Sequence, residues 1–388
     1  MAQLQILRFP RYMMLLGGVW QLPYFEDRTA QQVYKLYGLI IQSAFFLACF
    51  SMCEEFVRLV RADDIKQLTV NIKITFPASL LCLKLVVFQS GRFSHLLSRL
   101  VESEASFAAS CEPGTLTLYL QCQNYVEKCS KAILILAGGT GSFLIVSTIV
   151  AGLSGSSAPD LQKPMMFLAH FHFDQNLHYQ RALVLQTITV LLAIIYFCLC
   201  PILYLGVLGF IRAQLQVLQY RFSNFNSCKG SAGDVEMMKQ LIQAHQFIIW
   251  FVKDFNENMR SLILIEFLIS SVNIACVAFQ LISANRITDD IFTPCFLFVL
   301  FGQLLVLAWP ANEMSMESLG VSIAIYDFPW YQKNIAIQNM ARVVLLRAQT
   351  PLRLTIGLFN PLTTDTVIKV LNGAYSYVTI MTNNKEEA

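Results

Sequence analysis

The chain has 388 residues, of which 55% are hydrophobic and 14% are charged, and its net charge is +3. Soluble domains carry about 25% charged residues, so this composition excludes a soluble globular protein and indicates one embedded in a lipid bilayer. The small net charge gives no reason to expect nucleic acid as a partner.

A helix that crosses the hydrocarbon core of a bilayer needs about 20 mostly apolar residues. Segments of this kind recur along the chain, at 36–53, 68–87, 133–153, 183–211, 262–282, 292–309 and 364–381. The sequence therefore predicts an all-α fold, a single domain over residues 1–388 with seven transmembrane helices.

The basic residues predict how these helices are oriented, because Lys and Arg are enriched on the cytosolic side of membrane spans. They gather before the first span and between the second and third, the fourth and fifth, and the sixth and seventh spans. We therefore expect a cytosolic N-terminus and an extracellular C-terminus. The inner segments also carry apolar residues at helical spacing, which predicts a helical cytosolic anchor region over about 90–131, 212–260 and 313–361.

Two lysines, Lys73 and Lys84, lie inside the second span. A lysine in hydrocarbon costs roughly 3 kcal/mol, and its long stem usually lets the ammonium group reach the interface. Because the two residues lie near opposite ends of the span, we expect both to reach the headgroups. Most of the 11 cysteines also fall in apolar runs, so free thiols are expected rather than a disulfide framework.

The third span opens with the small residues Gly138-Gly139-Thr140-Gly141-Ser142. No strand precedes this run and no Lys completes a phosphate loop, so nucleotide binding is not expected. Small residues in a membrane helix either permit close packing, here through Gly138 and Ser142, or leave room for a ligand. Both interpretations remain open from the sequence.

The loop after the third span carries His170, His172, Asp174 and His178. Such a set could bind zinc, but the phenylalanines between them favour an aromatic lid folded over a pocket. We therefore predict neither a metal nor a cofactor. The chain also lacks the residue patterns of a catalytic site, so it is not expected to be an enzyme.

The last span repeats Thr, Asn, Ser and Tyr along its length. A polar group exposed to hydrocarbon costs free energy, so this helix needs water or protein on one side. The segment is therefore predicted to be a pore helix, extending over about 362–384.

Motifs in the C-terminal part of the chain point to a family. Trp309-Pro-Ala-Asn-Glu313 ends the sixth span, and Ala-Ile-Tyr at 324–326 precedes Trp330-Tyr331. A Pro-Leu-Arg-Leu-Thr-Ile-Gly run at 351–357 then leads to Tyr-Ser-Tyr at 375–377. This arrangement closely resembles the insect odorant receptor family.

The resemblance implies a tetrameric, odorant-gated, non-selective cation channel in the plasma membrane of sensory neurons. The short loop between the fourth and fifth spans is similar to that of the odorant-tuned subunits, which assemble with a shared co-receptor subunit and are surrounded by membrane lipid. By position in the family's pore helix, the resemblance implies a gate region made of Tyr377, Ile380, Met381, Asn383 and Asn384.

The resemblance also implies a pocket for a small, volatile, mostly apolar odorant. It would lie among the outer halves of the second, third, fourth and sixth spans and under the loop above them. The candidate lining residues are Ile72, Phe76, Leu80, Ser142, Ile145, Ile149, Phe167, Phe171, Thr189, Leu192, Tyr196, Phe292 and Phe296. They would form an apolar cavity with a few hydroxyl groups that orient an ester, alcohol or carbonyl.

Two other receptor classes are alternatives. The gustatory receptor family ends in a related motif, which Ser376-Tyr377 and Asn383 match only in half. G-protein-coupled receptors also have seven spans, but the predicted orientation is the reverse of theirs, and Asn360-Pro361 is not followed by the expected Tyr.

Overall fold

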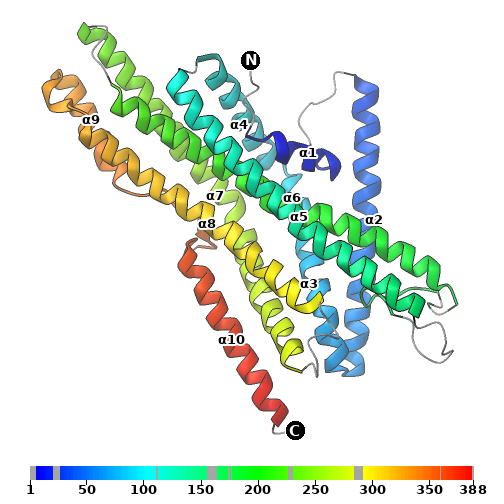
Figure 1. The fold of residues 1–388 in the computed structure, drawn as a ribbon. Helices are drawn as coiled ribbons and strands as arrows, with labels where there is room; N and C mark the ends of the chain where they lie inside the picture. The colour runs from blue at the N-terminus through cyan, green and yellow to red at the C-terminus, as the bar shows by residue number, and fades with distance from the viewer. Residues whose placement is uncertain are drawn as a thin grey trace.

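The computed structural model describes residues 6–20, 27–110, 112–154, 164–173, 175, 177–225, 230–283, 292–358 and 360–386. Within these ranges, the side chains of 65–66, 110, 153–154, 230–232, 282–283, 292, 377–378 and 380–386 are not described. Nearly all of the described chain is helical (Figure 1). The helices are α1 (Arg8–Leu16), α2 (Arg28–Ala62), α3 (Ile65–Phe88), α4 (Gly91–Ser110), α5 (Pro113–Ser154), α6 (Tyr179–Ser223), α7 (Gly230–Ser283), α8 (Phe292–Asp327), the 3-10 turn η2 (Trp330–Gln332), α9 (Ile335–Ala348) and α10 (Thr364–Glu386).

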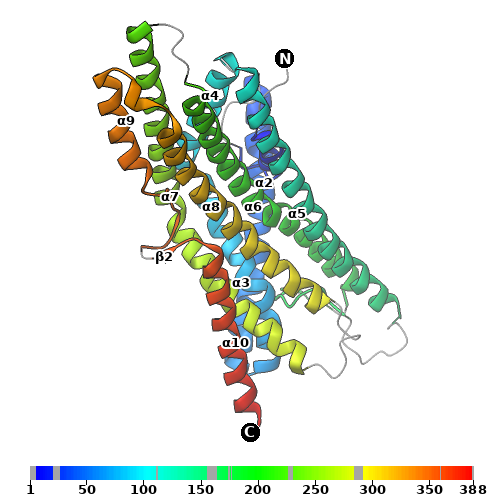
Figure 2. The same ribbon diagram turned by 60° about the vertical axis from the view of Figure 1, so that its left-hand side comes forward.

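The prediction of an all-α membrane protein is confirmed. In the part of the chain described, six helices are long and apolar enough to cross a membrane, namely α2, α3, α5, α6, α7 and α8. The seventh predicted span, 364–381, lies within α10, which is more polar. In both views α10 runs to the end of the molecule opposite α4 and α9 (Figures 1 and 2).

Five helices are far longer than a membrane span, among them α2 with 35 residues. Helices α5, α6, α7 and α8 have 42, 45, 54 and 36 residues, whereas 20 residues already cover about 30 Å. Their extensions reach the end of the molecule where α4 and α9 lie (Figures 1 and 2). The segments predicted to form the anchor region are therefore mostly helical.

Helix α6 is the centre of the fold. From Cys198 to Ile211 every residue is buried, and the helix continues without interruption through Pro201. A helix that is apolar on all sides is expected to be surrounded by other elements. Glycines allow this close packing: a side chain at Gly206 would meet Pro10 of α1, and one at Gly209 would meet Val126 of α5.

A short hairpin joins α9 to α10. Strands β1 (Thr355–Ile356) and β2 (Asn360–Pro361) pair antiparallel. The side chain of Asn256 in α7 accepts a hydrogen bond from the Thr355 N–H at 2.8 Å, and the Gly357 N–H donates to the Arg260 carbonyl at 3.0 Å. Gly357 has a φ of 61°, which glycine adopts at little cost. The chain that enters α10 is thus fixed to α7.

The expectation that Lys73 and Lys84 reach the headgroups is wrong. Lys73 is 5% exposed and Lys84 is 4% exposed. Lys84 Nζ lies 2.7 Å from Glu266 Oε1 of α7, and Lys73 Nζ donates to Thr293 Oγ1 of α8 at 3.1 Å. Each ammonium group has a polar partner on another helix, so neither needs to reach water.

A buried carboxylate on α4 connects the segment before α1 to α5. Glu104 Oε1 of α4 accepts hydrogen bonds from the Ile6 N–H at 2.9 Å and from the Tyr119 hydroxyl. Burial raises the pKa of Glu104 to about 7, although both hydrogen bonds oppose the shift. The folded protein therefore binds this proton more tightly than the unfolded chain does.

This shift predicts a pH-dependent stability. Between about pH 4.5 and pH 7 the folded state keeps a proton that the unfolded state loses, so stability falls as the pH rises through this window. The Glu104→Gln variant keeps an oxygen that can accept both hydrogen bonds but has no charge. We expect it to match the native protein at pH 5 and to be more stable at pH 8, by up to about 3 kcal/mol. Thermal melting of the detergent-solubilised protein at both pH values measures this, and an equal difference at both would contradict it.

Candidate ligand cavity

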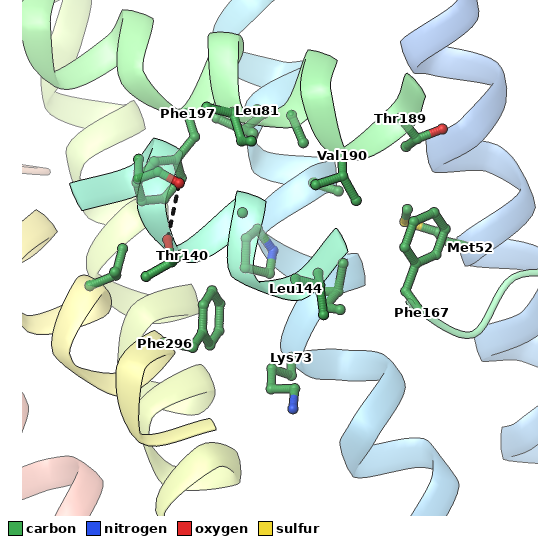
Figure 3. Close-up of a pocket in the computed structure, with 18 of the residues that line it drawn as sticks. Met52, Lys73, Leu81, Thr140, Leu144, Phe167, Thr189, Val190, Phe197 and Phe296 are labelled. Atoms are coloured by element: carbon green, nitrogen blue, oxygen red, sulfur yellow. Dashed lines mark hydrogen bonds between the residues drawn. The ribbon is translucent and has the colours of Figure 1, made fainter. Parts of the chain in front are cut away.

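An apolar cavity of about 140 Å³ lies inside the bundle, where α3, α5, α6 and α8 approach one another and α2 closes one side (Figure 3). Its lining residues are Phe45, Met52, Lys73, Ile74, Pro77, Ala78, Leu81, Ala137, Thr140, Gly141, Leu144, Phe167, Thr189, Val190, Ala193, Ile194, Phe197, Phe296 and Val299. Cavities of this kind bind small molecules mainly by apolar contact, with polar groups fixing the orientation.

The polar side chains of this wall are already engaged. Thr140 donates to carbonyl oxygens of its own helix at 3.0 and 3.1 Å, and Thr189 does the same at 2.9 Å. The ammonium group of Lys73 donates to Thr293 and points away from the other labelled side chains in Figure 3. The interior therefore favours a ligand that is recognised by shape and apolar contact.

The segment 164–173, the covering segment, contributes Phe167 to one side of the cavity wall. Two buried amides position it. Gln186 of α6 accepts from the Met166 N–H at 2.9 Å and donates to the Phe167 carbonyl at 2.8 Å, and Asn71 of α3 donates to the Leu168 carbonyl at 3.1 Å. The backbone on both sides of the Phe167 ring is thereby held against the bundle.

The two histidines of this segment, His170 and His172, do not line the cavity. His170 Nδ1 lies 3.0 Å from an Arg58 guanidinium nitrogen and 3.9 Å from Glu55 Oε2, and its ring contacts that of His172. Among the residues described, no group of three His, Cys, Asp or Glu could hold a metal ion. Asp174 lies outside the described residues. The nine cysteines that the structure describes are all free.

Of the residues predicted from the sequence to bind ligand, Phe167, Thr189 and Phe296 line the cavity. Phe171 lies in the covering segment but not in the wall, and the Phe292 side chain lies outside the described part. The remaining predicted residues lie elsewhere on the same helices: Ile72, Phe76, Leu80, Ser142, Ile145, Ile149, Leu192 and Tyr196.

Several of these residues support the cavity from behind or face outward. The Phe76 ring packs on Phe56 with centroids 5.7 Å apart, and the Tyr196 ring packs at 4.9 Å on Phe45, which does line the wall. Ser142 and Ile149 are exposed on the outer face of α5. The residues of α5 that line the cavity are instead Ala137, Thr140, Gly141 and Leu144. A run of mostly apolar residues gives no signal for which of them face inward.

The small residues of α5 combine the two roles left open by the sequence. A side chain at Gly141 would meet Ile194 of α6 at 2.4 Å, and Gly141 also lines the cavity. At Gly138, in contrast, nothing lies within 4 Å of an added side chain. Close packing and the cavity wall therefore coincide at Gly141.

Helix α10 lies beside the lower part of α7 (Figures 1 and 2) and also contacts α8. It buries Val367 and Ala374 against the bundle, whereas Asn372, Ser376 and Tyr375, which is 74% exposed, point away from it. The side chains predicted to form the gate lie outside the described part, namely Tyr377, Ile380, Met381, Asn383 and Asn384. The described turns of α10 thus present a polar stripe on the face that this chain leaves uncovered.

The clamp on the covering segment gives a testable prediction. Gln186→Leu keeps much of the side-chain volume but leaves two buried backbone groups without partners, at a cost of about 1–3 kcal/mol each. We expect the ligand concentration that gives a half-maximal response to rise at least about tenfold, because Phe167 loses its position in the cavity wall. Dose–response curves at matched surface expression measure the effect.

The matched control for this variant is Gln175→Ala. Gln175 also donates to the covering segment, at the Ala169 carbonyl, but it is only partly buried. An equal shift in both variants would show that Gln186 has no special role.

The comparisons with known proteins agree with this architecture. The sequence profile of the family described as 7tm Odorant receptor matches residues 64–375. Odorant receptor 10 of Aedes albopictus is 29% identical over 172 residues, which cover 43% of this chain and 46% of that protein. Odorant receptor Or2 of Anopheles gambiae is 28% identical over 187 residues, covering 48% and 50%. The chain thus spans about half the length of the curated relatives it matches.

The fold is also similar to a solved structure, the insect olfactory receptor OR5 from Machilis hrabei in complex with eugenol. The TM-score is 0.82 with 15% sequence identity, and the alignment covers 97% of each chain. The family comprises multi-pass membrane receptors and not enzymes. Because the family profile covers most of the sequence, this chain belongs to the insect odorant receptor family.

Proposed function

We propose that this chain is the odorant-binding subunit of a ligand-gated, non-selective cation channel. The observation that carries the proposal is the apolar cavity at the crossing of α3, α5, α6 and α8, within the fold of an odorant receptor. A small volatile molecule would bind there and change the packing of the surrounding helices.

The cavity wall favours a particular class of odorant. Its hydroxyl groups at Thr140 and Thr189 already donate to their own helices, so they remain available mainly as acceptors. The ligand would be a compact, mostly apolar molecule, with at most one hydroxyl group that donates to such an acceptor. The related OR5 structure was solved in complex with eugenol, which is a small aromatic molecule with one hydroxyl group.

The channel would be formed by several subunits around α10. The uncovered stripe with Asn372, Tyr375 and Ser376 is more polar than a lipid-facing helix tolerates, and water in a central pore would satisfy it. Ile380 would form the apolar constriction, with Tyr377, Met381, Asn383 and Asn384 around it. We propose a hetero-tetramer with a co-receptor subunit in the plasma membrane, with the N-terminus cytosolic and the C-terminus extracellular.

Co-expression tests this function directly. Cells that express the chain with an odorant co-receptor should show cation currents when small aromatic alcohols and aldehydes are applied. Cells that express either chain alone should show little or no such current. A gustatory-type receptor would respond without the co-receptor. A C-terminal tag that is accessible only from the cytosol would indicate a G-protein-coupled receptor instead.

A further inference from the structure

Three helices of the bundle meet at one buried carboxylate. Glu266 of α7 is 3% exposed, and its Oε1 atom accepts hydrogen bonds from Lys84 Nζ of α3 at 2.7 Å and from Gln303 Nε2 of α8 at 2.6 Å. The Lys84 side chain is equally buried. One oxygen atom therefore joins three helices that are distant in the sequence.

Stability alone gives no reason for this arrangement. Removing two charges from water is costly, and a buried ion pair can often be replaced by apolar residues without loss of stability. Removing only one partner is strongly destabilising, because the other charge is left buried. The pair therefore calls for a role other than packing.

The carboxylate lies next to the ligand cavity. Leu81 lines the cavity three residues before Lys84 on α3, and Val299 lines it four residues before Gln303 on α8. These separations correspond to about 4.5 and 6 Å along a helix axis. Helices α3 and α8 therefore line the cavity and, about one turn further along, carry the two side chains that donate to Glu266.

The same carboxylate lies on the helix that holds α10. Helix α7 runs beside α10 in both views (Figures 1 and 2), and the hairpin before α10 is bonded to α7 at Asn256 and Arg260. Glu266 follows Arg260 by less than two helical turns. A displacement of α7 at Glu266 would therefore be transmitted to the chain that enters α10.

The cavity is too small for most odorants in this arrangement. A cavity of about 150 Å³ holds one benzene molecule, and this one measures about 140 Å³. A ligand larger than benzene that is held entirely within this space must move the walls apart. Because interiors are close-packed, separation of α3 from α8 lengthens at least one of the two short hydrogen bonds to Glu266.

We propose that Lys84, Glu266 and Gln303 form a latch that holds the cavity walls and α7 in the resting arrangement, and that odorant binding releases it. The inference rests on the proposed function as an odorant-gated channel. It predicts that weakening the latch favours opening even when no odorant is present.

The decisive variant is the double substitution Lys84→Met with Glu266→Leu, which removes both charges and replaces them with apolar side chains of similar volume. Co-expressed with the co-receptor, it should raise the basal current and lower the half-maximal concentration of benzyl alcohol, benzaldehyde or 1-octanol by about tenfold, as expected for loss of a charged hydrogen bond. Gln303→Leu leaves the ion pair intact and should produce a smaller shift in the same direction.

Asn273→Ala is the matched control. Asn273 of α7 is fully buried and donates to the Lys73 carbonyl of α3 at 3.3 Å, so it joins two of the same helices at another level. This variant should lower the melting temperature without raising the basal current.

An unchanged or lower basal current in the double variant, at matched surface expression, overturns the latch. If the double variant does not reach the surface, the basal current of Gln303→Leu is the test, and an unchanged or lower value overturns the latch. A basal current that rises equally in Asn273→Ala also overturns it, because any loosening of α3 and α7 would then suffice. If none of the probes evokes current from the native chain with its co-receptor and no variant changes the basal current, the proposed function fails and the latch with it. Probe-evoked current from the native chain without a raised basal current in the double variant overturns the latch alone.

Discussion

Replacing Ala193 by Phe should abolish the odorant response. Ala193 lines the cavity from α6, and a phenyl ring at this position would occupy a space that holds little more than one benzene molecule. Since the ring fills an existing cavity, much of the usual overpacking cost of about 1–3 kcal/mol is avoided, and the protein should still fold. We expect sensitivity to fall at least about a hundredfold, equivalent to about 3 kcal/mol of lost binding.

Dose–response curves at matched surface expression test this prediction. The control is Ala151→Phe, which adds the same ring to an exposed position on α5. Ala193→Val should give an intermediate loss. A native response from Ala193→Phe would show that the odorant binds elsewhere, whatever the control does.

Replacing Ile380 by Ser should produce current without odorant. An apolar ring closes a pore by excluding water, so no charge is needed to stop ions. A small hydroxyl group in that ring would let water enter the constriction of α10. Ile380→Leu keeps the ring apolar and should behave almost as the native chain does.

The measurement is basal current at matched surface expression, in channels that also contain the co-receptor. The native residues of the other subunits will reduce the effect, so the comparison needs a control of the same chemistry. Ile149→Ser provides it, because Ile149 is 37% exposed on α5 and lies outside the cavity wall. Equal basal current from both variants would place the gate at another residue.

The sequence was sufficient to predict the long helices of this fold, although not α1 or the hairpin of β1 and β2. Each predicted span lies within an observed helix, and the polar residues of 364–381 fall on a helix with an uncovered face. These features depend on local properties of the chain, since hydrophobic length identifies a span and helix formation satisfies the backbone in lipid. The motifs near Trp309 and Tyr375 were similarly sufficient to identify the family.

The rotation of each helix about its own axis could not be predicted. Ser142 and Ile149 were expected in the pocket and are exposed, whereas Gly141 and Leu144 face the cavity. In a soluble helix the alternation of polar and apolar residues marks the buried face. In a membrane helix the lipid-facing side is as apolar as the packed side, so the sequence carries no equivalent signal.

The pairing of buried charges was decided only by the tertiary structure. Lys84 and Glu266 are 182 positions apart, and the sequence of either span alone suggests an isolated charge that must reach water. The packing of α3 against α7 instead brings the two together, where each offsets the cost of burying the other. Hydropathy thus determined which segments enter the membrane, while the contacts between those segments determined where the cavity lies and which polar groups surround it.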